Sequence, residues 1–186
     1  VLSETGHECD LQPDLNGDTL PGAIGTTEVL VVRSTPVTRA TVDAAISLRL
    51  IIRAGAGTNT IDKQAAAERE IPVCNVPGRN AAAVAELVIG LLIAIDRNIP
   101  DNVIDLRAGR WNKKRYSVAR GLYGRRLGVI GLGAIGLAVL ERARGFGLEL
   151  WVIEKSGRAD EVQQRLREIG VRTVPGIDAL IDQSDI

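Results

Sequence analysis

The stretch Leu127-Gly128-Val129-Ile130-Gly131-Leu132-Gly133-Ala134-Ile135-Gly136 decides the fold of this chain. A short apolar, β-branched run meets a G-x-G-x-x-G turn, and the turn opens into an Ala- and Leu-rich helical pattern. Glycines alone punctuate many loops, but a strand before the turn and a helix after it are typical of a dinucleotide site. The alternative is a tight turn of an α/β domain that binds nothing.

Each glycine of this turn has a physical task. Gly131 permits the tight turn, and Gly133 lets the backbone approach a pyrophosphate with no Cβ in the way. Gly136 lets the helix pack close to the sheet. The free N–H groups at the helix N-terminus then face the charge of the phosphates.

An acidic residue closes the next predicted strand. Glu154 lies eighteen residues past Gly136, directly after the apolar run 148–153. Its carboxylate can accept hydrogen bonds from ribose hydroxyls and would repel a 2′-phosphate, which favours NAD over NADP. Lys155 and Arg158 follow it and keep NADP as the lesser alternative.

The composition of the 186 residues excludes several classes of protein. The 45% hydrophobic content supplies a core, and 23 basic residues balance 23 acidic ones. This neutrality gives no reason to expect a nucleic acid or an anionic membrane as a partner. Cys9 and Cys74 have no C-x-x-C spacing, so we expect free thiols, no metal site and a reducing, cytoplasmic location.

Apolar runs alternate with helical patterns along the chain. Strands are expected at 29–32, 48–52, 73–75, 148–153 and 171–174, and helices at 41–46, 62–68, 101–108, 161–169 and 178–181, with a loop at 109–124. This alternation is typical of parallel sheets with helices on both faces. We expect an α/β protein with two Rossmann-like domains, residues 1–76 and 77–186, the second doubly wound.

The longest apolar stretch, 81–95, predicts a buried helix. It is shorter than the ~20 residues that span a bilayer, and it contains Glu86. Asn80 is expected to cap its N-terminus, and residues 96–98 followed by Pro100 to end or kink it.

Two arginines follow predicted strands of the first block. Arg33 comes after the strand 29–32, and Arg53 opens the sequence Arg53-Ala54-Gly55-Ala56-Gly57 after the strand 48–52. Ligands bind at this edge of open α/β sheets, where a guanidinium offers a fork for carboxylate or phosphate. The glycines would let backbone N–H groups form an anion-binding concavity. The alternatives are a surface arginine and a turn that needs positive φ. Residues 75–80, taken alone, fit a connector.

Taken together, these segments resemble the D-isomer-specific 2-hydroxyacid dehydrogenases, and among them the D-3-phosphoglycerate dehydrogenases. The resemblance covers nearly the whole chain in the right order, and it rests on Val32–Thr38, Arg53–Asp62, Asn75–Pro77 with Asn80 and Val84–Glu86, Gly109–Trp111, Gly131–Gly136 and Asp178–Ile186.

The resemblance implies NAD-dependent oxidation of 3-phosphoglycerate to 3-phosphohydroxypyruvate, the first committed step of serine synthesis. It places Arg33, Arg53 and Gly55 around the anionic substrate and Ala56 near the nicotinamide. Ala134 and Ile135 would contact the pyrophosphate, and Glu154 would hold the adenosine ribose, where the family usually has aspartate. It also implies a homo-oligomer that self-associates through the helix region 80–99.

The chain also departs from the pattern of this family. Thr58-Asn59-Thr60 replaces the commoner Val-Asp-Asn. The family's catalytic arginine, glutamate and histidine belong to later segments, so no residue here is named as catalytic, and His7 is expected at the surface. With no methionine and a last residue at a strand start, the chain is expected to be an inactive fragment. The alternatives are a dehydrogenase of another small D-2-hydroxy acid and a non-catalytic NAD-binding, corepressor-like regulator, and the paired arginines favour an enzyme.

Overall fold

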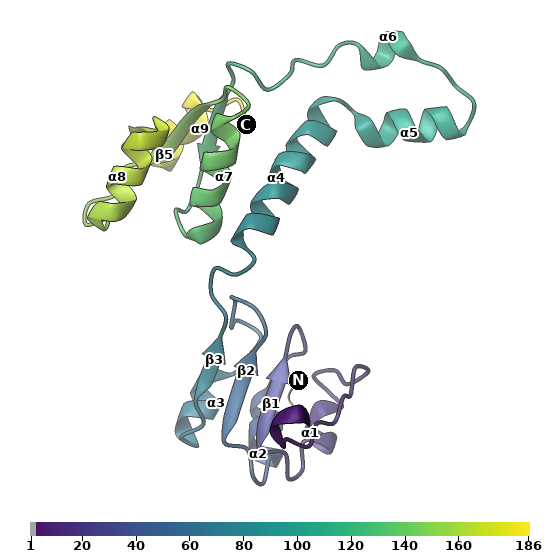
Figure 1. Cartoon of the computed structure of the whole chain (residues 1–186), viewed down its shortest axis with the longest axis vertical. Helices are drawn as coiled ribbons and strands as arrows, with labels where there is room; N and C mark the ends of the chain where they lie inside the picture. Colours follow the sequence, from purple (N-terminus) through teal and green to yellow (C-terminus); the bar gives the residue numbers. More distant parts are fainter. Residues whose placement is uncertain (1–2) are drawn as a thin grey trace. The chain divides into compact units, whose positions relative to one another are not determined.

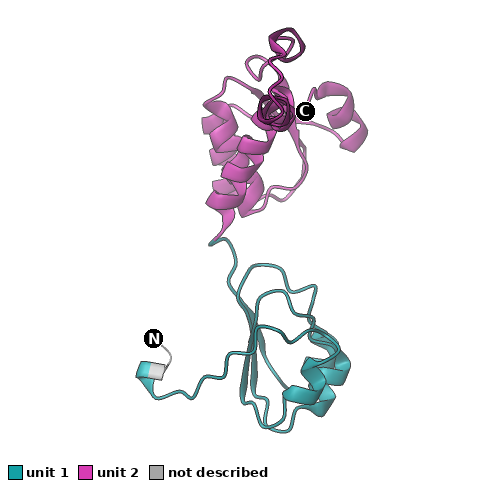
Figure 2. Ribbon diagram, turned by 90° about the vertical axis from the view of Figure 1, so that its right-hand side faces the viewer, with its two compact units in different colours: residues 1–79 teal, residues 80–186 magenta. Residues whose placement is uncertain are grey.

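The computed structural model describes residues 3–186 and divides the chain into two compact units, Val1–Arg79 and Asn80–Ile186 (Figures 1 and 2). Each unit is built on one three-stranded, all-parallel sheet, with the strand orders β1-β2-β3 and β4-β5-β6. The predicted α/β class with parallel sheets is confirmed.

The first unit alternates short helices and strands. In chain order its elements are η1 (Ser3–Thr5), α1 (Leu20–Ala23), β1 (Val29–Val32), α2 (Arg39–Ala44), β2 (Leu50–Arg53), α3 (Lys63–Glu68) and β3 (Val73–Asn75). The two helices between strands begin at side-chain caps. Thr38 accepts from the backbone N–H of Thr41, and Asp62 accepts from that of Ala65.

One face of the first sheet carries the core of this unit. Val32 and Ile51 point to this face and are buried against residues of α2 and α3 such as Val42 and Ala66. On the other face of β1, Val29 and Val31 remain 47% and 52% exposed. The alternation follows from the two-residue period of a strand.

The second unit holds the longer helices. Its elements are α4 (Ala81–Asp96), α5 (Ile99–Arg107), α6 (Lys113–Tyr116), β4 (Arg126–Val129), α7 (Ala134–Arg144), β5 (Glu149–Ile153), α8 (Asp160–Ile169), β6 (Arg172–Val174) and α9 (Ile177–Gln183). The main strands and helices lie where the sequence predicts them, with ends shifted by up to two residues.

Helices cover both faces of the second sheet. Leu127 of β4 is buried in one core with residues of α7 such as Leu140. Its neighbour Gly128 points the opposite way, where an added Cβ would meet Leu180 and Ser184 of the α9 region. Successive residues of a strand face opposite sides, so α7 and α9 lie on different faces. This is the doubly wound arrangement expected of this part of the chain.

The long helix α4 is confirmed, and Asn80 is its N-cap residue, as expected. The Asn80 carbonyl accepts from the backbone N–H of Val84 at 3.0 Å, but its side chain makes no capping hydrogen bond. The helix ends at Asp96, Asn98 takes a left-handed conformation, and Pro100 lies in the first turn of α5, where its missing N–H costs no hydrogen bond. Among residues 3–186 no helix is long and apolar enough to cross a membrane.

The predicted loop 109–124 contains α6, and a buried carboxylate fastens it to α5. Asp105 is 7% exposed and accepts hydrogen bonds from Arg110 at 2.7 Å and from the hydroxyl of Tyr116 at 2.7 Å. These bonds, first that of Tyr116 and then that of Arg110, lower the pKa of Asp105. Burial and the same bond raise the pKa of Tyr116. The segment between α5 and α6 is therefore held in place.

A second charged cluster seats the last residues beside β4. Asp185 accepts from the backbone N–H of Arg126 at 3.0 Å and from its Nε at 3.2 Å, and Arg125 donates to the Asp185 carbonyl at 3.1 Å. Arg125 also pairs with the half-buried Asp96 at the end of α4, at 3.1 Å. The bonds from Arg126 hold the pKa of Asp185 far below its ordinary value.

Candidate functional site

The G-x-G-x-x-G turn joins the end of β4 to the start of α7, as the sequence predicts. Gly131 has φ +90°, a conformation that residues with a Cβ rarely adopt. Gly133 is the N-cap of α7 and has an extended backbone, with φ −77° and ψ −173°. The dihedral angles of the turn therefore require glycine at Gly131. They do not by themselves require it at Gly133 or Gly136.

Gly133 and Gly136 differ in what surrounds them. A Cβ added at Gly136 would lie 2.1 Å from the backbone oxygen of Gly131, so the turn itself excludes a side chain there. A Cβ added at Gly133 would meet no atom of the described chain within 4 Å. Gly136 is thus required by the fold, and Gly133 leaves open space in front of the helix.

The N-terminus of α7 faces this open space with free hydrogen-bond donors. The first bond within the helix runs from Leu137 N–H to the Gly133 carbonyl, so the N–H groups of Ala134, Ile135 and Gly136 have no acceptor within the helix. The helix dipole adds partial positive charge at the same end. Ala134 is exposed, and Ile135 is 39% exposed. These donors and the bare Gly133 fit a pyrophosphate.

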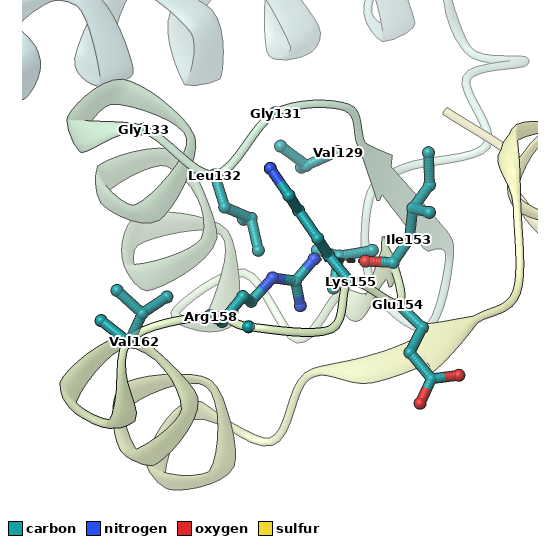
Figure 3. Close-up of a pocket in the computed structure, with 12 residues that line it drawn as sticks. Val129, Gly131, Leu132, Gly133, Ile153, Glu154, Lys155, Arg158 and Val162 are labelled. Carbon is teal, nitrogen blue, oxygen red and sulfur yellow. Dashed lines mark hydrogen bonds between the residues drawn. The ribbon is translucent and has the colours of Figure 1, made fainter.

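An open cavity of about 540 Å³ extends from this turn toward the end of β5 (Figure 3). Its lining combines apolar side chains with three charged ones and consists of Val129, Gly131, Leu132, Gly133, Val152, Ile153, Glu154, Lys155, Gly157, Arg158, Ala159 and Val162. Apolar walls beside a turn with free N–H donors suit the base and ribose of an adenosine.

The three charged side chains of the cavity point in different directions. In Figure 3 the guanidinium of Arg158 lies among the lining residues and Lys155 extends toward Gly131, while the carboxylate of Glu154 points away from them. Arg158 donates from Nη2 to the carbonyl of Ile153. Glu154, the residue expected to hold the adenosine ribose, lines the cavity, but in this conformation its carboxylate is exposed to solvent.

The two arginines of the first unit lie at the same edge of their sheet. Val32 is the register partner of Arg53, and Arg33 follows Val32 directly. Both guanidinium-bearing residues therefore stand at the carboxyl ends of neighbouring parallel strands. Arg33 is exposed and Arg53 is half-buried.

The Arg53 side chain folds back over its own glycine loop. A Cβ added at Gly55 would lie 2.3 Å from Nη1 of Arg53, and the Arg53 Nε is buried with no partner among the described residues. Neither Gly55 nor Gly57 has positive φ, so the alternative of a left-handed turn is wrong. In this conformation the guanidinium of Arg53 covers Gly55.

Asn75 is a residue of this site that sequence reasoning left in a connector. It is the register partner of Arg53 on β3, and its Nδ2 donates to the Ala56 carbonyl at 2.6 Å. The backbone N–H of Val76 donates to the Gly55 carbonyl at 3.0 Å. Only the parallel register, which the sequence alone does not fix, brings these residues together.

The remaining candidates from the sequence stay outside both sites. His7 is exposed, and Cys9 and Cys74 are exposed free thiols. Within residues 3–186 no cluster of His, Cys, Asp and Glu could hold a metal ion.

Comparison with known proteins identifies relatives over the whole chain. D-3-phosphoglycerate dehydrogenase of Methanocaldococcus jannaschii is 40% identical over 187 residues, which cover 100% of this chain and 34% of that protein. Hydroxypyruvate reductase of Thermotoga maritima is 43% identical over 137 residues, or 73% of this chain and 44% of that protein. The chain thus spans less than half the length of both.

A solved structure shares the fold. The NAD-dependent formate dehydrogenase of Staphylococcus aureus, determined in complex with NAD, matches with a TM-score of 0.82 and 28% identity over 99% of this chain and 54% of its own. The model of the catalytic domain of D-isomer specific 2-hydroxyacid dehydrogenases matches residues 1–180. The chain therefore belongs to the D-isomer specific 2-hydroxyacid dehydrogenase family.

Proposed function

We propose that this chain is the cofactor-binding part, with a portion of the substrate-binding part, of an NAD-dependent D-2-hydroxyacid dehydrogenase. The substrate is 3-phosphoglycerate, which is oxidised to 3-phosphohydroxypyruvate in the first committed step of serine synthesis. The observation that best supports this proposal is the turn at Gly133, which is open to a ligand in front of three free N–H donors.

The cofactor is NAD, a choice supported by family membership and by the NAD complex of the Staphylococcus aureus relative. When bound, NAD accepts the hydride of the substrate alcohol. The residues of this chain bind and orient it. Ala134 and Ile135 donate backbone N–H groups to the pyrophosphate, and Glu154 turns inward to accept from the ribose hydroxyls.

The phosphorylated substrate is supported by the relatives and by the first unit. Two relatives named D-3-phosphoglycerate dehydrogenase cover the whole chain at 40% and 34% identity. Arg33 and Arg53 supply two cations at one sheet edge for a dianionic phosphate and a carboxylate. Among residues 3–186 Arg53 forms no ion pair with a carboxylate, so its charge is available to an anionic ligand.

A dehydrogenase of another small D-2-hydroxy acid is the second candidate. The Thermotoga maritima relative, a hydroxypyruvate reductase, is 43% identical over 73% of the chain. Hydroxypyruvate has no phosphate. The two candidates therefore differ in whether substrate binding requires both Arg33 and Arg53.

The protein is proposed to self-associate through the 80–99 region. Leu87, Leu91 and Ile95 recur every four residues along α4 and are 60%, 51% and 73% exposed. Such a stripe on a 16-residue helix is typical of an interface between copies. Leu91→Lys should shift the chain to a smaller species in sedimentation velocity, and an unchanged mass contradicts this contact.

The free thiols Cys9 and Cys74 fit the reducing environment of a cytoplasmic protein.

The substrate is tested with the full-length protein by following NADH absorbance. We expect kcat/KM for 3-phosphoglycerate to exceed that for glycerate and for lactate by at least about 100-fold, because the phosphate adds charge-assisted hydrogen bonds. Equal values for glycerate and 3-phosphoglycerate would favour the second candidate. Arg33→Ala and Arg53→Ala should each raise the KM for 3-phosphoglycerate. Arg49→Ala, at the opposite end of β2, is the control and should leave it unchanged.

A further inference from the structure

The adenosine end of the cavity carries more positive than negative charge. Lys155 and Arg158 contribute one positive charge each and Glu154 one negative charge, so the charged lining sums to +1. A lining suited only to an unphosphorylated ribose needs the carboxylate alone. An unphosphorylated ribose therefore does not account for Lys155 and Arg158 in the lining.

Neither cation is neutralised by a carboxylate of residues 3–186. Within the described part of the chain, Lys155 and Arg158 form no ion pair with a carboxylate. The bond from Arg158 Nη2 to the Ile153 carbonyl holds the guanidinium in the cavity, and the same residue is partly buried (Figure 3). The other N–H groups of its planar fork stay available to an anion.

The carboxylate that would repel a second anion is poorly placed to do so. Glu154 is exposed and points away from the other lining residues (Figure 3), so it can turn inward to an unphosphorylated ribose and keep its present direction beside a 2′-phosphate. Between solvated groups the repulsion of like charges is about 1 kcal/mol at 4 Å and is screened by salt. A guanidinium held in a partly buried wall, in contrast, forms directed, charge-assisted hydrogen bonds.

We propose that this cavity accepts an adenosine ribose that carries a 2′-phosphate, so that the chain binds NADPH as well as NADH, with Arg158 as the specificity-determining residue. The inference rests on the proposed dinucleotide site and deepens it. Arg158 pairs with the 2′-phosphate through its free N–H groups, and Lys155 adds a second cation. A phosphate monoester carries about −1.5 to −2 charges at neutral pH, which the cations offset.

The test is calorimetric titration of the 186-residue chain with NADH and with NADPH. We expect the Kd for NADPH to be no more than about tenfold above that for NADH. Arg158→Gln should raise the ratio of the two Kd values at least about tenfold, through weaker NADPH binding, and Lys155→Gln should raise it less. Arg167→Gln, an exposed arginine of α8 outside the cavity, is the matched control and should leave the ratio unchanged.

A second measurement avoids reliance on any variant. Adenosine 2′,5′-bisphosphate should displace NADH from the unaltered chain at a lower concentration than 5′-AMP does, and added salt should narrow the difference. A Kd ratio above tenfold, an Arg158→Gln effect equal for both dinucleotides, or weaker displacement by the bisphosphate would overturn the inference. Failure to bind NADH at all would instead refute the proposed dinucleotide site.

Discussion

The two units place glycines after a parallel strand in the same topology and use them differently. The loop after β2 is closed, because the Arg53 guanidinium covers Gly55 and the Asn75 side chain donates a hydrogen bond to the Ala56 carbonyl. The turn after β4 is open at Gly133 and leads at once into the 11-residue helix α7. In the first unit α3 begins only at Lys63 and has six residues.

The difference shows that a glycine loop at a strand end does not by itself specify a ligand. In the second unit the backbone N–H groups and the dipole of a following helix provide the positive potential. In the first unit no helix follows closely, and a side-chain cation provides it instead. One arrangement suits a pyrophosphate that lies against the main chain, and the other suits a small anion bound by a fork.

The largest effect is expected at Gly136. Gly136→Ala places a Cβ 2.1 Å from the Gly131 backbone oxygen, which is not a flexible group, so the turn and α7 must move. We expect the free energy of unfolding of the second unit to fall by about 3 kcal/mol or more. Both tryptophans of the chain, Trp111 and Trp151, lie in this unit, so urea unfolding followed by their fluorescence reports it selectively.

Gly90→Ala is the matched control for that measurement. Gly90 lies in α4 with no described atom within 4 Å of an added Cβ, and alanine there should stabilise the helix by up to about 1 kcal/mol. An equal change in the free energy of unfolding for the two variants would contradict the close contact between Gly136 and the Gly131 carbonyl.

Gly133→Val should separate binding from folding. The side chain enters open space in front of α7, so the free energy of unfolding should change by no more than about 1 kcal/mol. NADH affinity should fall at least about 100-fold, or ~2.7 kcal/mol, because the branched side chain occupies the pyrophosphate position. Titration with NADH measures it, and unchanged affinity would refute the assignment of the turn.

Arg53→Ala should affect the substrate alone. In the full-length protein we expect the KM for the phosphorylated substrate to rise about tenfold or more, since a charge-assisted hydrogen bond contributes about 1.5–3 kcal/mol. NADH affinity should not change, because its donors belong to α7. A variant that loses NADH binding as well would mean that the two loops are not independent sites.

Gly55→Ala should be tolerated better than Gly136→Ala. The atom in its way is the end of a flexible arginine side chain, so the guanidinium moves and the backbone stays. We expect a loss of under about 1 kcal/mol in thermal unfolding followed by circular dichroism, with a KM increase smaller than that of Arg53→Ala. A loss as large as that of Gly136→Ala would contradict the contrast between the two loops.

The smallest effect concerns acid stability, which should depend on Asp185 in the second unit. The pKa of Asp185 is lower in the folded chain than in the unfolded chain, so its contribution is present above about pH 4 and is lost as the pH falls below that value. Asp185→Asn should flatten the pH dependence of tryptophan-monitored unfolding in this range. The exposed Asp182→Asn should leave it unchanged, and identical profiles for both would exclude the ion cluster as the cause.

Periodicity was sufficient to predict the main elements, because local patterns determine them. The strand at Val129, the helix after Gly133 and the acid at Glu154 follow from apolar period and spacing alone. The position of Asn80 at the N-cap of α4 was predictable, but the absence of a side-chain capping bond depends on its local conformation, which no residue type fixes. The short helix α6 has a local signal, because the side chain of Asn112 caps its N-terminus, but the helix has only four residues, and its last residue, Tyr116, bonds to the buried Asp105 of α5.

The candidate sites were predictable to the extent that they consist of backbone geometry. The open space at Gly133 follows from the motif, whereas the covering of Gly55 by Arg53 depends on one side-chain conformation. Asn75 joined the site through strand register. The inward direction of Arg158 depends on its bond to the Ile153 carbonyl, and such a side-chain contact cannot be inferred from composition.

The seating of the last residues beside β4 determines where the glycine turn lies within the sheet. Ile186 donates to the Arg126 carbonyl and accepts from the Gly128 N–H, which is the pattern of parallel pairing around Leu127. β4 therefore has a neighbour on each side, β5 on one and this segment on the other. The crossover from β4 to β5 runs through α7 over one face of the sheet, and the connection from β6 to the last residues runs through α9 over the other. The turn thus opens at the topological switch point, where the loops diverge and a crevice forms.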